Sequence, residues 1–130
     1  MDNITIYKGK KYSLELDEGK ANLFSYNLEM YPSIRGLNTE EIDYAYKTRK
    51  WVKIRGYEAL YNGINEGFVL LDVRPSIDVG ILEAKQVDRD TYHARLPISE
   101  IESMWEERMP FLNFPFPEGL PLRQDLEIPS

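Results

Sequence analysis

Clustered carboxylates are the side chains in this sequence whose spacing comes closest to a catalytic or metal-binding pattern. They form four groups: Glu15/Asp17, Glu40/Glu41/Asp43, Asp88/Asp90 and Glu100/Glu102/Glu106/Glu107. Such groups can hold Mg²⁺ or Ca²⁺, or supply the acid and the base of glycoside cleavage. The Asp88 group lacks the loop glycine and the distal glutamate of an EF-hand. The groups at 40–43 and 100–107 are better explained as helix caps and solvated faces.

Other catalytic and ligand-binding patterns are missing from the sequence. His93 is the only histidine, lies in a predicted strand and has no serine motif for which to act as a base. There is no cysteine, which excludes thiolate nucleophiles, disulfides and cysteine-based zinc sites. Gly63 and Gly67 fit turns, and no glycine-rich phosphate loop is present. We therefore predict no catalytic residue, no cofactor and no metal ion.

The charge balance argues against a nucleic-acid-binding protein. The 130 residues are 42% hydrophobic and 12% aromatic, with a formal net charge of −6 and a pI near 4.9. A negative surface repels phosphates, and the basic groups at 8–11 and 47–55 are small and interleaved with strand aromatics. The same charge attracts a basic partner, although mild acidity also serves solubility alone.

The sequence also bears on the compartment. It has no run of about 18 apolar residues, so we expect no membrane span. Residues 1–5 lack the basic stretch and apolar core of a secretory signal. Because the absence of cysteine fits a reducing compartment, we expect a cytoplasmic protein.

A weak internal repeat predicts the elements that position these residues. The stretches 4–14 and 51–60 each read as an alternating strand, a basic residue, a glycine and an aromatic strand. Turns at 17–20 and 62–67 then lead to return strands at 22–26 and 68–73. In the second unit, residues 80–85 and 91–96 are expected to pair as a further hairpin.

Each repeat ends in a segment that fits a short helix, at 38–49 and at 99–108. Aligning Ile42 with Ile101 also aligns Asp43 with Glu102 and Tyr46 with Trp105. The pairs Asn38/Glu41 and Ser99/Glu102 have the spacing of a capping box. Ile42 and Tyr46, like Ile101 and Trp105, stand four apart and would share one helix face. Tyr46 and Trp105 are therefore expected in the core, and Tyr44, off that face, at the surface.

The predicted fold class is α+β, mostly β, with two strand-strand-short-helix units that form small SH3-like curled sheets. The expected boundaries are 1–50 for the first unit, 51–111 for the second, and 112–130 for a proline-rich C-terminal extension. Prolines exclude regular helix or central strand there. We expect Phe111, Phe114 and Phe116 to hold the first half of that stretch against the body, and residues 124–130 to form a loose tail.

The run 41–58, EIDYAYKTRKWVKIRGYE, resembles small immunity proteins of bacterial polymorphic-toxin systems, especially those of Bacillus and relatives. The resemblance covers residues 4–111. It implies a protein without enzyme activity that neutralises a cognate toxin by binding its toxic domain. Many toxin domains are nucleases with basic clefts, so an acidic inhibitor would gain association rate by electrostatic steering. The first candidates for partner contact are Glu40, Glu41, Asp43, Tyr44, Glu100, Glu102, Glu106 and Glu107.

Two other classes of protein remain open at this point. A duplicated SH3-like adaptor would show a persistent apolar groove and would have no toxin gene beside its own. A small carbohydrate- or nucleotide-processing enzyme would need a deep pocket that holds two convergent carboxylates.

Overall fold

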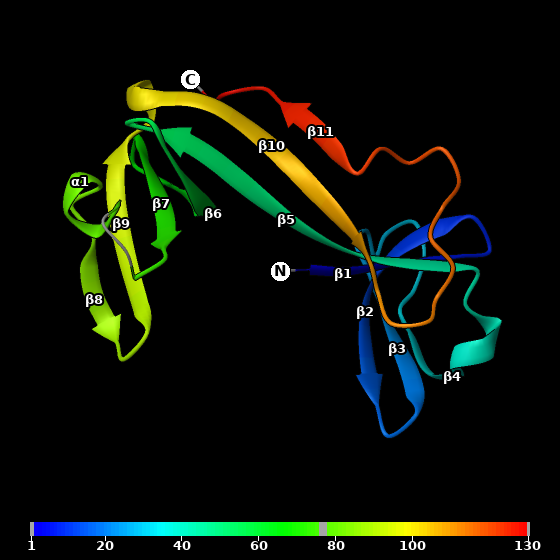
Figure 1. Cartoon of the computed structure of the whole chain (residues 1–130). Helices are drawn as coiled ribbons and strands as arrows, with labels where there is room; N and C mark the ends of the chain where they lie inside the picture. Colours follow the sequence, from blue (N-terminus) through cyan, green and yellow to red (C-terminus); the bar gives the residue numbers. More distant parts are fainter. Residues whose placement is uncertain (1, 76–77, 130) are drawn as a thin grey trace. The chain divides into compact units, whose positions relative to one another are not determined.

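A computed structural model describes residues 2–75 and 78–129, and strands dominate these residues (Figure 1). The strands form antiparallel pairs, and short helical turns interrupt them. The chain divides into two compact units, Met1–Thr48 with Arg108–Leu122 (unit 1) and Arg49–Glu107 with Arg123–Ser130 (unit 2). Both units contain part of β5 (Tyr44–Ile54) and part of β10 (Ile101–Pro110). None of the helices within the described ranges is long and apolar enough to cross a membrane.

Unit 1 is built on five strands. These are β1 (Asp2–Tyr7), β2 (Lys10–Asp17), β3 (Lys20–Ser25), β4 (Ile34–Asn38) and the first part of β5. They pair in the order β4-β3-β2-β1-β5, with Ile4 opposite Tyr46 across β1 and β5. Leu14, Leu23 and Ala45 lie at the centre of the core, because alternate residues of each strand face inward.

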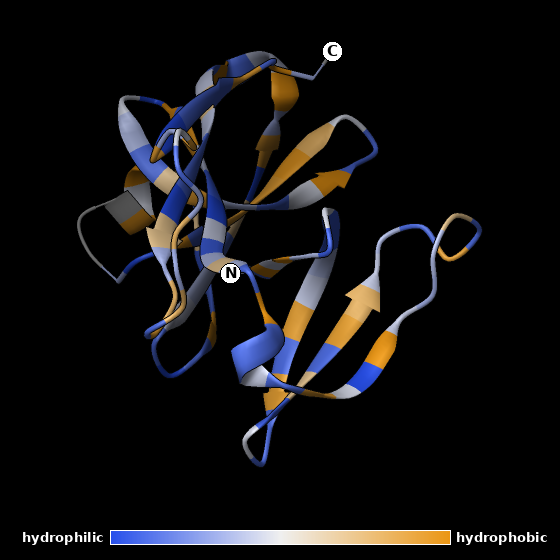
Figure 2. Ribbon diagram, turned by 90° about the vertical axis from the view of Figure 1, so that its right-hand side faces the viewer, coloured by the Kyte–Doolittle hydropathy of each residue, from blue (hydrophilic) through white to orange (hydrophobic). Residues whose placement is uncertain are grey.

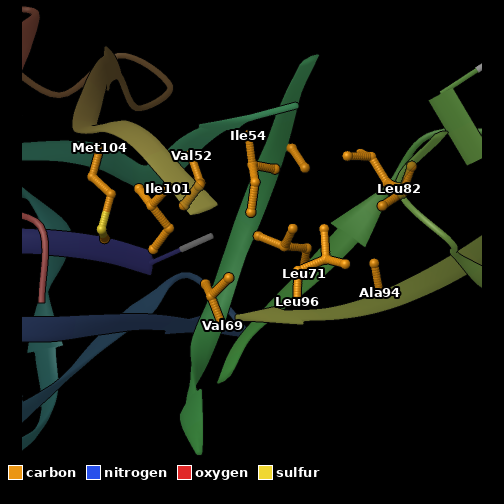
Figure 3. Packing of buried hydrophobic residues seen from close by; sticks show 11 residues of the cluster. Val52, Ile54, Val69, Leu71, Leu82, Ala94, Leu96, Ile101 and Met104 are labelled. Carbon is orange, nitrogen blue, oxygen red and sulfur yellow. The ribbon is translucent and has the colours of Figure 1, made fainter. Parts of the chain in front are cut away.

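Unit 2 repeats this strand path and adds β8 (Lys85–Asp88) at one edge and the short strand β11 (Arg123–Leu126), paired with β10, at the other. The second part of β5 is followed by β6 (Tyr57–Asn65), β7 (Phe68–Val73), α1 (Asp78–Ile81), β8, β9 (Thr91–Pro97) and β10. The pairing order is β10-β5-β6-β7-β9-β8. The side chains of Ile54, Leu71 and Leu96, from β5, β7 and β9, lie together in the core of this unit (Figure 3).

Both units begin with the same tight hairpin. Tyr7 pairs with Lys10 and Ile54 pairs with Tyr57, so each turn has two residues, Lys8-Gly9 and Arg55-Gly56. All four residues have positive φ, at 50° and 75° in unit 1 and at 52° and 80° in unit 2. This is the type I′ geometry that matches the twist of paired strands, and glycine adopts it without strain.

The predicted α+β fold class is wrong, because the two segments expected to be helices are mostly strand. Residues 39–41 and 98–100 form single 3₁₀ turns, η1 (Thr39–Glu41) and η2 (Ile98–Glu100), and β5 and β10 follow them. Neither turn receives a side-chain cap bond. The misleading signal was the four-residue spacing, since residues four apart also share a face of a strand, where the period is two. Along several strands the colours accordingly alternate between hydrophobic and hydrophilic (Figure 2).

Two smaller predictions also need correction. The hairpin expected from 80–85 and 91–96 is formed by β8 and β9, and residues 78–81 are helical instead. The expected loose tail contains β11 (Arg123–Leu126), which pairs with β10, with Glu107 opposite Arg123. The stretch before it belongs to unit 1, where Phe111 is buried and Phe116 packs edge-on against Tyr46 at 5.9 Å.

Candidate functional site

The 3₁₀ turn η1 presents two carboxylates of unit 1 to solvent. Glu40 and Glu41 are both exposed, and neither has a hydrogen-bond or ion-pair partner among the described residues. Asp43 follows the turn, and its carboxylate accepts the backbone N–H of Lys8 at 3.1 Å. Tyr44, at the start of β5, is 38% exposed, whereas Tyr46 is 7% exposed, as predicted. Glu40 and Glu41 are thus the sequence-predicted acids of this unit that are free to meet a partner.

An open groove of about 470 Å³ runs beside Glu40. One wall comes from β2 and η1, through Leu16, Thr39 and Glu40, and the other from residues 112–115. Leu16 and Leu112 are 37% and 68% exposed, and Phe114 contributes an aromatic ring. The groove therefore combines apolar contact surface with an unpaired carboxylate at its edge.

Backbone hydrogen bonds hold the second wall of this groove in place. The N–H of Ala45 donates to the carbonyl of Pro115 at 3.0 Å, which joins the segment to the start of β5. The N–H of Phe114 donates to the carbonyl of Phe111 at 3.1 Å, and the two rings meet edge to face at 5.8 Å. Since Phe111 is buried, it anchors the segment that carries Leu112 and Phe114.

The predicted acids of unit 2 have different surroundings. Glu100 takes two guanidinium hydrogen bonds from Arg55, at 3.0 and 3.1 Å, and Glu83 takes a third from the same group at 2.8 Å. The hydrogen bonds to Glu100, and to a smaller extent the one to Glu83, therefore raise the pKa of the Arg55 guanidinium above its ordinary value. The carboxylate of Glu102 accepts the N–H of Gly56 at 2.7 Å. These acids hold the turn between β5 and β6.

The last two predicted acids lie on β10. Glu107 forms an ion pair with Arg49 at 2.7 Å. The Arg49 side chain is 25% exposed and that of Glu107 is 33% exposed. Glu106 is half-buried and lies opposite Gln124 of β11. The eight predicted residues are thus divided between the units, and those of unit 2 mostly have partners within the unit.

The lone histidine lies in β9, as its sequence context predicted. Its Nε2 is 3.0 Å from the carboxylate of Asp72, and the side chain is 47% exposed. Among residues 2–75 and 78–129, no group of three or more histidine or acidic side chains has the arrangement of a metal site.

A cleft in unit 2, where arginine side chains lie against two tryptophans, was not predicted from the sequence. Trp105 was expected in the core, and Arg123 lies in the predicted proline-rich extension 112–130, but nothing placed the two together. Only the pairing of β11 with β10 brings Arg123 beside Trp105, and the local sequence carries no signal for it.

Comparison with protein-family models, curated proteins and solved structures gives no match for this chain.

Proposed function

We propose that this chain is a non-enzymatic bacterial protein of the cytoplasm that neutralises a cognate toxin by binding its basic toxic domain. The observation that carries the proposal is the groove of unit 1, where exposed apolar side chains adjoin the unpaired carboxylates Glu40 and Glu41. The resemblance of residues 41–58 to immunity proteins supports this class of partner, as does the net charge of −6.

The two parts of the surface have different tasks in this proposal. Leu16, Leu112 and Phe114 lose contact with water when a partner covers them, which supplies affinity in proportion to the apolar area buried. Glu40 and Glu41 attract a basic domain over a distance, which raises the association rate and selects against acidic partners. Exposed Tyr44 is of a residue type that often dominates interface energies.

The acids of unit 2 are not part of the proposed contact. Glu100 and Glu102 are bonded to the β5–β6 turn, and Glu107 is paired with Arg49. A partner that used them would have to break these bonds, at the cost of leaving their donors unpaired.

Calorimetry with a purified toxic domain tests the proposal. The domain encoded by the neighbouring gene is titrated with the wild-type chain, with Glu40→Lys/Glu41→Lys, and with the control Glu29→Lys/Glu118→Lys. The control residues are exposed, lie in unit 1 and have carboxylates without a partner among the described residues, so the control makes the same change of charge outside the groove.

We expect binding that weakens as salt is added, because steering between exposed charges is screened. The Glu40→Lys/Glu41→Lys variant should raise Kd by at least about tenfold, and the control by less than about threefold. Absence of binding, or equal losses in the two variants, would contradict the proposed surface.

A further inference from the structure

The cleft of unit 2 is the strongest feature that the proposed function leaves unexplained. It has a volume of about 680 Å³ and opens to solvent. Both tryptophans of the chain, Trp51 and Trp105, line it together with Tyr57. All its lining residues belong to unit 2, so it is separate from the groove beside Glu40.

Arginine side chains cover the tryptophan rings of this cleft. The guanidinium carbons of Arg49 and Arg74 lie 5.0 and 5.3 Å from the centroid of the Trp51 ring. That of Arg123 lies 4.2 Å from the centroid of the Trp105 ring. Because Trp51 and Trp105 are only 7% and 5% exposed, a flat ligand cannot stack on their rings without displacing the arginines. A guanidinium held against a ring still presents its N–H groups at its edge, where they suit an oxyanion.

The cleft is also positively charged, although the chain as a whole is negative. Four cationic side chains, those of Arg49, Lys53, Arg74 and Arg123, line it against the two carboxylates of Glu58 and Glu107. Arg49 is already paired with Glu107, and Arg123 lies 3.6 Å from the carboxylate of Asp125, outside the lining. Arg74 and Lys53 are exposed and have no ion-pair partner in the part of the chain that the structure describes. The lining thus carries a net formal charge of +2 in a protein of −6.

We propose that this cleft binds a phosphate dianion, either free or as a monoester of a small organic molecule. A phosphate monoester carries a charge of about −1.5 to −2 at neutral pH, which matches the lining. Its oxygens can take paired N–H bonds from a guanidinium, as Arg74 can offer. The volume of the cleft is within the range of small-molecule sites, so it leaves room for the organic group of a monoester.

Intrinsic fluorescence gives a direct readout, because the only two tryptophans of the chain line the cleft. The full-length protein is titrated at pH 7.5 and constant ionic strength with inorganic phosphate, glycerol 3-phosphate, dimethyl phosphate and sodium chloride. The first two are mostly dianions, and dimethyl phosphate is a monoanion of similar shape. Calorimetry with the same compounds detects binding that leaves the fluorescence unchanged.

We expect saturable binding of inorganic phosphate, of glycerol 3-phosphate or of both, at least about tenfold tighter than that of dimethyl phosphate. Whichever of the two dianions binds more tightly identifies the source of the phosphate. Arg74→Gln should weaken binding about tenfold, and Lys53→Gln should weaken it severalfold. The matched control Arg89→Gln removes an exposed arginine of the same unit outside the cleft and should leave binding unchanged.

Three results would overturn the proposal. One is the absence of saturable binding of either dianion by both methods. Another is binding of dimethyl phosphate as tight as that of the tighter-binding dianion. The third is an equal effect of Arg74→Gln and Arg89→Gln, which would place the anion elsewhere on the protein.

Discussion

The first hairpins of the two units use the same device with different side chains. In each unit a carboxylate that follows the 3₁₀ turn accepts a backbone N–H from the two-residue turn between the first two strands. In unit 1 Asp43 accepts the N–H of Lys8 at 3.1 Å, and in unit 2 Glu102 accepts the N–H of Gly56 at 2.7 Å. The sequence alignment that pairs Asp43 with Glu102 thus pairs two residues with one structural task.

The units differ in what surrounds that turn. In unit 2 the basic turn residue, Arg55, is bonded to Glu100 and Glu83. In unit 1 the basic turn residue, Lys8, places its ammonium over the ring of Tyr7, at 5.3 Å. Glu41, which aligns with Glu100, consequently has no partner among the described residues. Of two aligned carboxylates, Glu100 thus stabilises a turn, whereas Glu41 is available to a partner protein. The search for a partner surface therefore begins in unit 1.

The largest expected effect concerns the shared turn geometry. Gly9→Ala and Gly56→Ala place a side chain at φ values of 75° and 80°, with nothing within 4 Å of the added atom. The loss therefore comes from backbone strain alone, and each variant should lose roughly 1–2 kcal/mol of unfolding free energy in a urea titration. Gly80→Ala, where φ is not positive, is the control and should cost less than either. A loss in one hairpin only would break the parallel between the units.

A smaller effect should separate the aligned acids. Glu100→Gln weakens the bonds to Arg55, whereas Glu41→Gln changes a side chain with no partner among the described residues. We expect the Tm of Glu100→Gln to fall further than that of Glu41→Gln, by roughly 2 °C, when both are measured by circular dichroism. Since ion pairs at the surface are screened, the difference should shrink in high salt. Equal Tm values would mean that Glu100 is as free as Glu41.

The strands were easier to predict from the sequence than the elements between them. Alternation and glycine turns located 4–14, 51–60 and 68–73 correctly, because a half-buried strand and a type I′ turn both leave local patterns. The helix predictions at 38–49 and 99–108 failed because the spacing of Ile42 and Tyr46 fits both periods. Strand pairing decided between them, with Tyr46 opposite Ile4 in β1.

The candidate sites were only partly accessible to sequence reasoning. Tyr44 is exposed and Tyr46 and Trp105 are buried, as predicted, but the reason given for Tyr44, a separate helix face, does not hold, because Tyr44 and Tyr46 are two residues apart in β5 and share a face of the strand. The hydrogen-bond partners of Glu100 and Glu102 could not be predicted, because Arg55 and Gly56 are 45 and 46 residues away along the chain. The groove and the cleft depend on residues 112–115 and on Arg123, which non-local pairing brings into place.

Hydrogen exchange of the complex with the neighbouring gene's toxic domain tests the central claim most directly. We predict that binding slows amide exchange in peptides that cover 39–42 and 112–116, the two walls of the groove in unit 1. Peptides that cover the β5–β6 turn around Arg55 should exchange as in the free protein. Protection confined to unit 2, or no change anywhere when the two proteins are mixed, would contradict the account.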